Sequence, residues 1–460
     1  MHLWFILPLL AVLVQARPDP EDFKLKNDTD DNMETRKTVK NILSRMKVKQ
    51  TPGKEEKVGE KKMKRAVSAP QPKKEEPEIK PPNVPNPRVR IHEVNKNIAE
   101  WMHEGDMLLN IEQAKAIAAG CLDDDCETDA GKKQKRAATT NPANYWDVKT
   151  PIYYTIDQSI QNDAQKLPLV KAAVAYWQAN TCLNFQNSNG PSALNYYIGS
   201  GCWSYVGKQG WSSQQISIGN GCESLGTVCH ETAHALGFYH EQSRADRDDY
   251  VTINLNNIAP NLQYNFVKMT PQTSNNLGVP YDYGSVMQYD AFAFATDPNQ
   301  MTIIPKDKNY ASSMGQREAP AFSDVISVNN LYNCSSICST KPNCKNSGIV
   351  NSRKCSECLC PKMFTGPDCS QVAKGNAVNC NGKVLQAPPG RKIQFQVTQA
   401  SMCLDQCPWQ SFDINLGNFQ LGGMLLCCQT DVFISTSNQI SIRGMSLYNQ
   451  LRMQFKYKLV

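Results

Sequence analysis

The run from His230 to His240, which reads HETAHALGFYH, constrains this chain more than any other feature. The chain of 460 residues has six histidines, and three of them, His230, His234 and His240, lie in this run. His230 and His234 are four residues apart, so on a helix they lie on one face and can reach one metal ion. Gly237 can end that helix in a left-handed conformation, which lets the chain turn back and bring in His240.

This arrangement predicts a catalytic zinc site. Three imidazoles leave one coordination position of the ion open, as in catalytic rather than structural zinc sites. Zinc lowers the pKa of a bound water to about 7 and polarises a carbonyl group. Glu231, beside the first ligand, would take the proton of that water and pass it to the leaving amine. HExxH alone also arises by chance on amphipathic helices, whereas the extended form is specific.

The residues after the run resemble the astacin family of zinc peptidases. Residues 240–251, HEQSRADRDDYV, are similar to the family pattern, and residues 285–289, SVMQY, resemble its Met-turn. The resemblance implies that Met287 forms an apolar floor under the metal. It also implies that Tyr289 donates its hydroxyl to the oxyanion of the reaction. Gln288 stands where most members have histidine, and this is not a ligand position.

The N-terminus predicts secretion. Residues 1–16 are typical of a signal peptide, because their apolar run is too short to span a membrane and ends at a small-residue cleavage site. Eighteen cysteines fit an oxidising compartment. We therefore expect an extracellular protein without a membrane anchor. Asn27 and Asn333 begin glycosylation sequons.

Residues 17–136 are expected to form a propeptide. Residues 17–90 are rich in Lys, Glu, Pro and Asp, and they are predicted to be largely disordered. The net charge of +6 is modest and much of the lysine lies in this stretch. A solvated charged linker explains the excess of lysine in this stretch, and no nucleic-acid partner is expected. From Ile91 to Gly120 apolar periodicity returns and predicts short helices.

By resemblance to the FxGD motif of astacin propeptides, Asp106 would occupy the open zinc position and displace the water. His103 stands where Phe is usual, and a plain Gly-Asp turn between helices is the alternative. Arg136 ends a basic run that a dibasic-specific processing convertase would cut. The amine freed at Ala137 would then pair with Glu241, by the same resemblance.

Residues 137–334 are expected to form an α+β catalytic domain, with a mixed sheet and the zinc-binding helix. Alternating patterns predict strands at 152–156, 195–198 and 214–218. Helical spacing of apolar residues predicts a helix over 167–177. In astacins, the edge of this sheet binds a peptide as an added antiparallel strand.

Two further modules are expected after residue 334. Residues 335–370 resemble an EGF-like module, and residues 380–460 resemble a short or truncated CUB-like β-sandwich. The resemblance implies the disulfides Cys182–Cys334, Cys202–Cys222, Cys338–Cys355, Cys344–Cys358 and Cys360–Cys369. It gives no partner for Cys229, and the partner of Cys380 stays open.

Together these patterns predict a secreted zinc endopeptidase, made as a zymogen and activated when the propeptide is removed. Its architecture resembles that of nematode astacins, and its substrates would be extracellular proteins such as those of matrix, cuticle or eggshell. The alternative is a catalytically silent protein that uses its C-terminal modules for adhesion. A silent relative would be expected to lose a ligand or the base, but His230, His234, His240, Glu231 and Tyr289 are all present.

Overall fold

The computed structural model describes residues 30–46, 89–122, 138–139, 141–271, 273–374, 383–400, 407, 410–446 and 453–460. The expected signal peptide, the Arg136 processing site with Ala137, the Asn27 sequon and Cys380 lie outside these ranges. Every helix within them is too short or too polar to cross a membrane.

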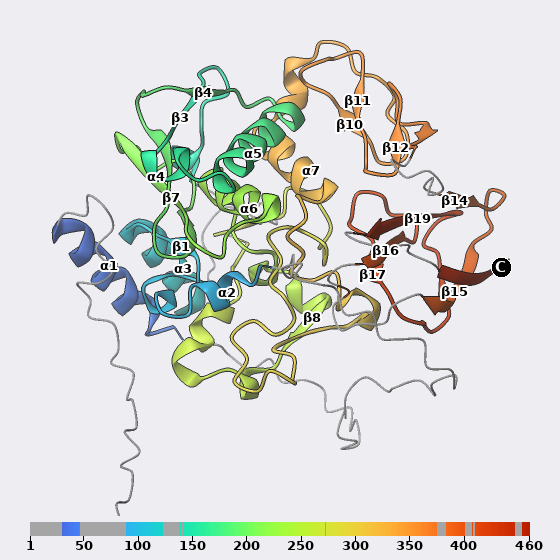
Figure 1. The fold of residues 1–460 in the computed structure, drawn as a ribbon, viewed down its shortest axis with the longest axis horizontal. Coiled ribbons are helices and arrows are strands. Elements are labelled where there is room, and N and C mark those ends of the chain that lie inside the picture. The colour runs from blue at the N-terminus through green and yellow to red at the C-terminus, as the bar shows by residue number, and fades with distance from the viewer. Residues whose placement is uncertain are drawn as a thin grey trace, which may run out of the picture.

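The helices and strands have the following bounds (Figure 1). The α-helices are α1 (Asp30–Leu43), α2 (Ile91–Val94), α3 (Ile111–Leu122), α4 (Gln158–Gln161), α5 (Lys166–Asn180), α6 (Leu225–Ala235) and α7 (Phe322–Leu331). The strands up to residue 305 are β1 (Met107–Leu108), β3 (Ile152–Ile156), β4 (Phe185–Asn187), β5 (Ala193–Tyr197), β6 (Cys202–Tyr205), β7 (Ser213–Ile218), β8 (Val251–Ile253) and β9 (Ile303–Pro305). The later strands are β10 (Ile349–Val350), β11 (Cys358–Leu359), β12 (Phe364–Thr365), β13 (Gln371–Val372), β14 (Lys383–Gln386), β15 (Ile393–Ala400), β16 (Gln410–Asn415), β17 (Met424–Leu426), β18 (Phe433–Ile434), β19 (Gln439–Ser446) and β20 (Met453–Leu459).

A six-stranded mixed sheet forms within residues 107–218, in the order β1-β6-β7-β5-β3-β4. Only the β6–β7 pair in it is antiparallel. Its strands share one buried cluster with α5 and α6, in which Trp177 of α5 and Val228 of α6 pack near Leu194 and Ile216 of the sheet. The strands expected at 152–156, 195–198 and 214–218 are β3, β5 and β7, and the expected helix lies within α5.

The outermost strand of this sheet comes from the N-terminal part of the chain. β1 pairs in parallel with β6, with Met107 opposite Ser204 and Leu108 opposite Tyr205. We call residues 89–122, which contain this strand, the covering segment. It lies against the edge of this six-stranded sheet, on the side where α1 and α3 are drawn in Figure 1.

Helix α1 is a difference from the sequence prediction, which treated residues 17–90 as largely disordered. Val39, Leu43 and Met46 of this region are buried in one cluster with Ile117 of α3. Their spacing of four and three residues gives the helix one apolar face. The highly charged average composition of the stretch conceals this face, so the helix could not be recognised from the sequence.

The C-terminal part contains two disulfide-bonded units. Residues 335–374 form the two-stranded sheets β10–β11 and β12–β13. Beyond them, a four-stranded sheet, β14-β19-β16-β17, and a three-stranded sheet, β18-β15-β20, share one core around Phe395, Ile414 and Ile440. This sharing of one core by two sheets agrees with the expected β-sandwich.

The structure contains these disulfides: Cys182–Cys334, Cys202–Cys222, Cys338–Cys355, Cys344–Cys358, Cys360–Cys369 and Cys407–Cys427. The first five are the pairs that the family resemblance implied, and the sixth was not predicted. Among the described cysteines, Cys229 is free and buried.

Candidate metal centre

Helix α6 delivers the first two histidines, and its two ends fix how it lies. The Ser224 side chain accepts a hydrogen bond from the Thr227 N–H (3.0 Å) and so caps the start of the helix. The helix ends at Ala235, and Gly237 has φ +102, in the left-handed region that glycine adopts without strain. The chain then reverses and brings His240 back to the helix, as the sequence predicts.

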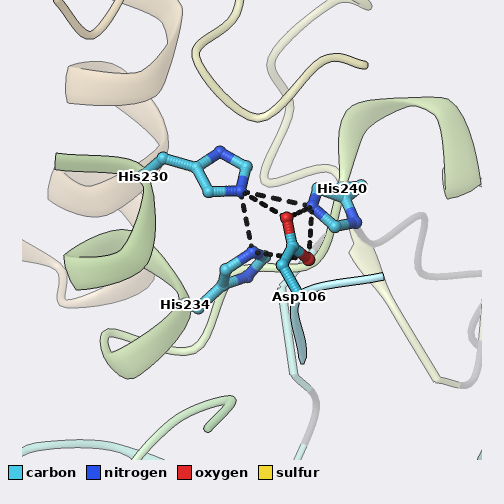
Figure 2. A group of neighbouring side chains, drawn as sticks. All are labelled: Asp106, His230, His234 and His240. Carbon is cyan, nitrogen blue, oxygen red and sulfur yellow. Dashed lines mark hydrogen bonds and ion pairs between the residues drawn. The ribbon is translucent and has the colours of Figure 1, made fainter. Parts of the chain in front are cut away.

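Four side chains converge at this point (Figure 2). Nε2 of His230 lies 3.0 Å from Nε2 of His234 and 3.3 Å from Nε2 of His240. The Asp106 carboxylate lies among them, with Oδ2 at 3.2 Å from Nε2 of both His230 and His240. All four side chains are buried, so one small space holds three imidazoles and a carboxylate.

The Nδ1 atoms of His230 and His234, which point away from the group, carry the imidazole protons. Nδ1 of His230 donates to the Val286 carbonyl (2.8 Å) and Nδ1 of His234 donates to the Phe238 carbonyl (2.7 Å), because a carbonyl oxygen can only accept. Burial lowers the pKa of both imidazoles and keeps them neutral, so their Nε2 atoms present lone pairs. Two facing lone pairs at 3.0 Å repel unless a cation lies between them.

The third histidine is oriented by a carboxylate. Nδ1 of His240 donates to Oε2 of Glu104 at 2.7 Å, and Glu104 is itself buried. Burial opposes a positive charge here, yet Asp106 and Glu104 together raise the pKa of His240 to about 9. These two carboxylates therefore favour a positive charge at His240. Three imidazole nitrogens oriented by hydrogen bonds, together with a carboxylate, fit one zinc ion.

A tight loop carries Asp106 into the group. His103 and Met107 exchange both backbone hydrogen bonds (2.8 and 3.1 Å) and close a loop over the three residues between them. Glu104 and Gly105 have φ +50 and +82. A Cβ atom on Gly105 would lie 2.7 Å from Cζ of Phe294, so the loop has room only for glycine there. The turn that the sequence left as an alternative is present, and Asp106, the last of its three residues, reaches the histidines.

Glu231 and Tyr289 have buried polar atoms without hydrogen-bond partners among the described residues. Both carboxylate oxygens of Glu231 are in this state, and burial followed by the charge of Asp106 raises its pKa well above the usual value. The Tyr289 hydroxyl is likewise unpaired, and its ring centroid lies 4.5 Å from that of His240. Buried polar atoms in a native protein are normally satisfied, so these groups await a ligand or water.

The Met-turn residues and Glu241 lie directly beside the histidines. The Met287 carbonyl accepts from the Glu241 N–H at 3.0 Å, and its side chain is part of the main core. Oε1 of Glu241 accepts from Arg244 (2.9 Å) and from the Asp282 N–H (2.8 Å). Gln288, the departure from the family, is buried and accepts from the Tyr281 hydroxyl at 2.5 Å.

Sequence reasoning missed three residues of the site. Glu104 orients His240, and Asn95 pairs with the sheet edge beside the group. Arg317 is buried near the site, where its charge acts on Glu231 and Asp106, and its Nη1 donates to the Gln288 carbonyl. Glu104 directly precedes the Gly-Asp motif, and this position was the only sequence signal that could have identified it. Asn95 and Arg317 lie in no motif.

The chain resembles known zinc peptidases. Residues 138–333 match the model of the Astacin peptidase family. Zinc metalloproteinase nas-28 of Caenorhabditis elegans is 38% identical over 416 residues, which cover 82% of each chain. Zinc metalloproteinase dpy-31 of the same organism is 32% identical, and the match covers 71% of this chain and 60% of that protein.

Among solved structures, high choriolytic enzyme 1, a hatching enzyme zinc-protease from Oryzias latipes (medaka fish), has 33% sequence identity. The match covers 43% of this chain and 98% of that one, with a TM-score of 0.39.

Proposed function

Because the chain belongs to the astacin family and is a zinc metalloendopeptidase, we propose that it is secreted as an inactive precursor that hydrolyses extracellular proteins once residues before Ala137 are removed. The observation that carries this proposal is the Asp106 carboxylate inside the group of three imidazoles. A carboxylate in that place takes the position that an attacking water needs. Substrates of matrix, cuticle or eggshell type follow from the resemblance to nematode astacins.

The proposed mechanism assigns one task to each side chain. The Nε2 atoms of His230, His234 and His240 would hold zinc, which supplies an acidified water and a polarised carbonyl when bound. Glu231 takes a proton from the water. It then passes that proton to the leaving amine.

Tyr289 stabilises the charge that develops during the reaction. Its hydroxyl is buried and unpaired among the described residues, so it is free to donate to the oxyanion without first breaking another hydrogen bond. Met287 is buried in the main core, and by the family resemblance it would form an apolar floor under the metal.

Activation would remove the covering segment after a convertase cuts behind Arg136. Asp106 then leaves the histidines and the water position opens. Glu241, which Arg244 and the Asp282 N–H already hold, would accept the new amine of Ala137 as a further partner. Secretion is supported by the disulfides, which form in oxidising compartments.

The test uses the full-length precursor before and after cleavage behind Arg136. Hydrolysis of a protein substrate such as casein is expected only after cleavage, and a zinc chelator should abolish it until zinc is restored. The precursor with Asp106→Ala should gain activity before cleavage. Its matched control is Glu112→Ala, an exposed carboxylate of the same segment.

Two results would overturn the proposal. Activity of the processed protein that survives the chelator would remove zinc from the mechanism. A wild-type precursor as active as the processed form would remove the inhibitory role of Asp106.

A further inference from the structure

Asp290 directly follows Tyr289, and its carboxylate is paired with an imidazole of the covering segment. Nδ1 of His92 donates to Oδ2 of Asp290 at 3.2 Å, and the two side chains are only 12% and 10% exposed. The other oxygen, Oδ1, accepts from the Phe292 N–H at 2.9 Å. Asp290 therefore has one hydrogen bond within its own loop and one partner that leaves when the covering segment is removed.

A pocket surrounds this pair. It is lined by residues 89–92 of the covering segment and by Tyr289, Asp290, Gly315 and Arg317. A Cβ atom on Gly315 would lie 2.4 Å from Cβ of Asp290, so glycine at 315 leaves room for the carboxylate. Ile91, beside His92, is buried in the main core and holds the segment in place. Once the covering segment has left, Asp290 lines an opening directly beside Tyr289.

The charges around Asp290 come from the covering segment. Burial opposes the negative charge of this carboxylate, but His92 and Arg90 outweigh burial and hold the pKa of Asp290 at about 2. Arg90 lies over the ring of Phe292, with its Cζ atom 6.0 Å from the ring centroid. Both His92 and Arg90 are lost on processing, so the carboxylate loses the two groups that stabilise its charge most.

Arg317 stays in the processed enzyme, but it does not replace His92. Its Nη1 donates to two backbone carbonyls, those of Gln288 and Gln316, and no ion pair joins it to Asp290 within the described residues. Its charge is also shared with other carboxylates of the site. Leaving a mostly buried carboxylate without its direct partner is unfavourable, so a cation that enters this pocket would be bound.

The position of Asp290 places such a cation near the bond that is cut. Under the proposed mechanism Tyr289 donates to the oxyanion, and its ring centroid lies 4.5 Å from that of His240. Neighbouring Cα atoms are only about 3.8 Å apart. A substrate side chain that reaches Asp290 therefore belongs to a residue close to the cleaved bond, and arginine and lysine are the side chains that are positively charged at neutral pH.

We propose that Asp290 is a specificity-determining residue whose carboxylate binds an arginine or lysine side chain of the peptide substrate near the cleaved bond, and that His92 takes the place of that side chain in the precursor. This inference rests on the proposed function and adds which substrates the processed enzyme prefers. It requires a cationic side chain at one position of the substrate, not a high overall positive charge.

The first test uses processed wild-type enzyme and internally quenched peptides, each with a single lysine at a different position around the cleaved bond. A matched set carries Nε-acetyl-lysine, which has the same stem but no charge. At one position kcat/KM should be about tenfold higher for lysine than for acetyl-lysine, on the scale of a charge-assisted hydrogen bond, and arginine should match lysine. Ratios near one at every position would overturn the proposal, because water alone would then cover Asp290.

The second test follows the same ratio in variants of the processed enzyme. Asp290→Asn can still accept from the Phe292 N–H but has no charge, so its ratio should fall close to one. Asp290→Glu keeps the charge and should keep part of the preference. Asp249→Asn, which changes an exposed carboxylate of the same region, is the matched control and should keep the wild-type ratio.

A ratio of kcat/KM values is independent of the active fraction of a preparation, so partial misfolding of a variant does not change the result. Equal ratios in the Asp290→Asn and Asp249→Asn enzymes would overturn the role of Asp290. Failure of the proposed function would look different, because no processed protein would then cleave any peptide of either set.

Discussion

Glu231 is a buried carboxylate whose oxygens have no hydrogen-bond partner among the described residues. Burying such a group is unfavourable for folding, and catalysis is the reason that we assign to it. Glu231→Gln keeps the shape but cannot take a proton. We expect kcat of the processed enzyme to fall by about 10²–10⁴, with KM and zinc content close to wild type.

Steady-state kinetics and metal analysis of the same preparations check this expectation, with Glu357→Gln in the disulfide-rich region as the control. If kcat of the Glu231→Gln enzyme were undiminished, another group would have to be the base.

Cys229 is the neighbour of His230 in sequence, but its side chain belongs to the main core. It is buried, and burial raises the pKa of its thiol, so the reactive thiolate does not form at neutral pH. We expect iodoacetamide to leave the Cys229 peptide unmodified in the native protein and to alkylate it after unfolding, as read by mass spectrometry. Cys229→Ala should keep kcat within about twofold and lower stability by about 1 kcal/mol. Alkylation of native protein with loss of activity would contradict this interpretation.

At this scale, sequence predicts contacts that are close along the chain. His230 and His234 are linked by helical spacing alone, so their convergence could be foreseen. Asn95 and Cys202 lie 107 positions apart, and no periodicity connects them. The sequence gives no sign of the role of Arg317 either, because only the folded chain brings its charge near Glu231.

Helix α6 carries His230 and His234, so its first turn matters to the whole group of histidines. Ser224 caps it by accepting from the Thr227 N–H. Ser224→Ala should lower the free energy of unfolding by about 1 kcal/mol, because it leaves that N–H without its partner. Denaturant unfolding measures the change, and Ser224→Asp, which can still accept, should stay near wild type. Equal losses in both variants would place the effect in packing rather than capping.

The elements that sequence could locate are those with one apolar face. β3, β5, β7 and α5 show clear periodicity and were predicted. β6 is buried along its whole length, so its residues do not alternate and no strand was assigned there. α1 was missed for a different reason, since its apolar residues are few among many charges.

The backbone of the C-terminal sandwich lies directly against the catalytic region at Gly422. The Gly422 N–H donates to Oδ2 of Asp282 at 2.8 Å, and a Cβ atom on Gly422 would lie 3.2 Å from Cα of Gly284. Gly422→Val should push the two parts apart. We expect faster limited proteolysis between them and a lower melting temperature, because the valine side chain has no room there.

Asp431→Ala is the control for this contact. It removes an exposed ion pair with Lys308 in the same contact region, and such pairs add little stability. If it loosened the two parts as much as Gly422→Val does, surface charge would outweigh the close backbone approach. Sequence could suggest both parts but not this contact, because glycine carries no pattern that identifies its neighbour.

The parallel pairing of β1 with β6 has a consequence for the survival of the precursor. A peptide to be cut is expected to run antiparallel to that edge, so the covering segment enters the cleft backwards. The peptide bonds of the covering segment therefore run in the opposite N-to-C direction from those of a peptide to be cut. Under the proposed scheme, such an inhibitor is not consumed by the enzyme that it blocks.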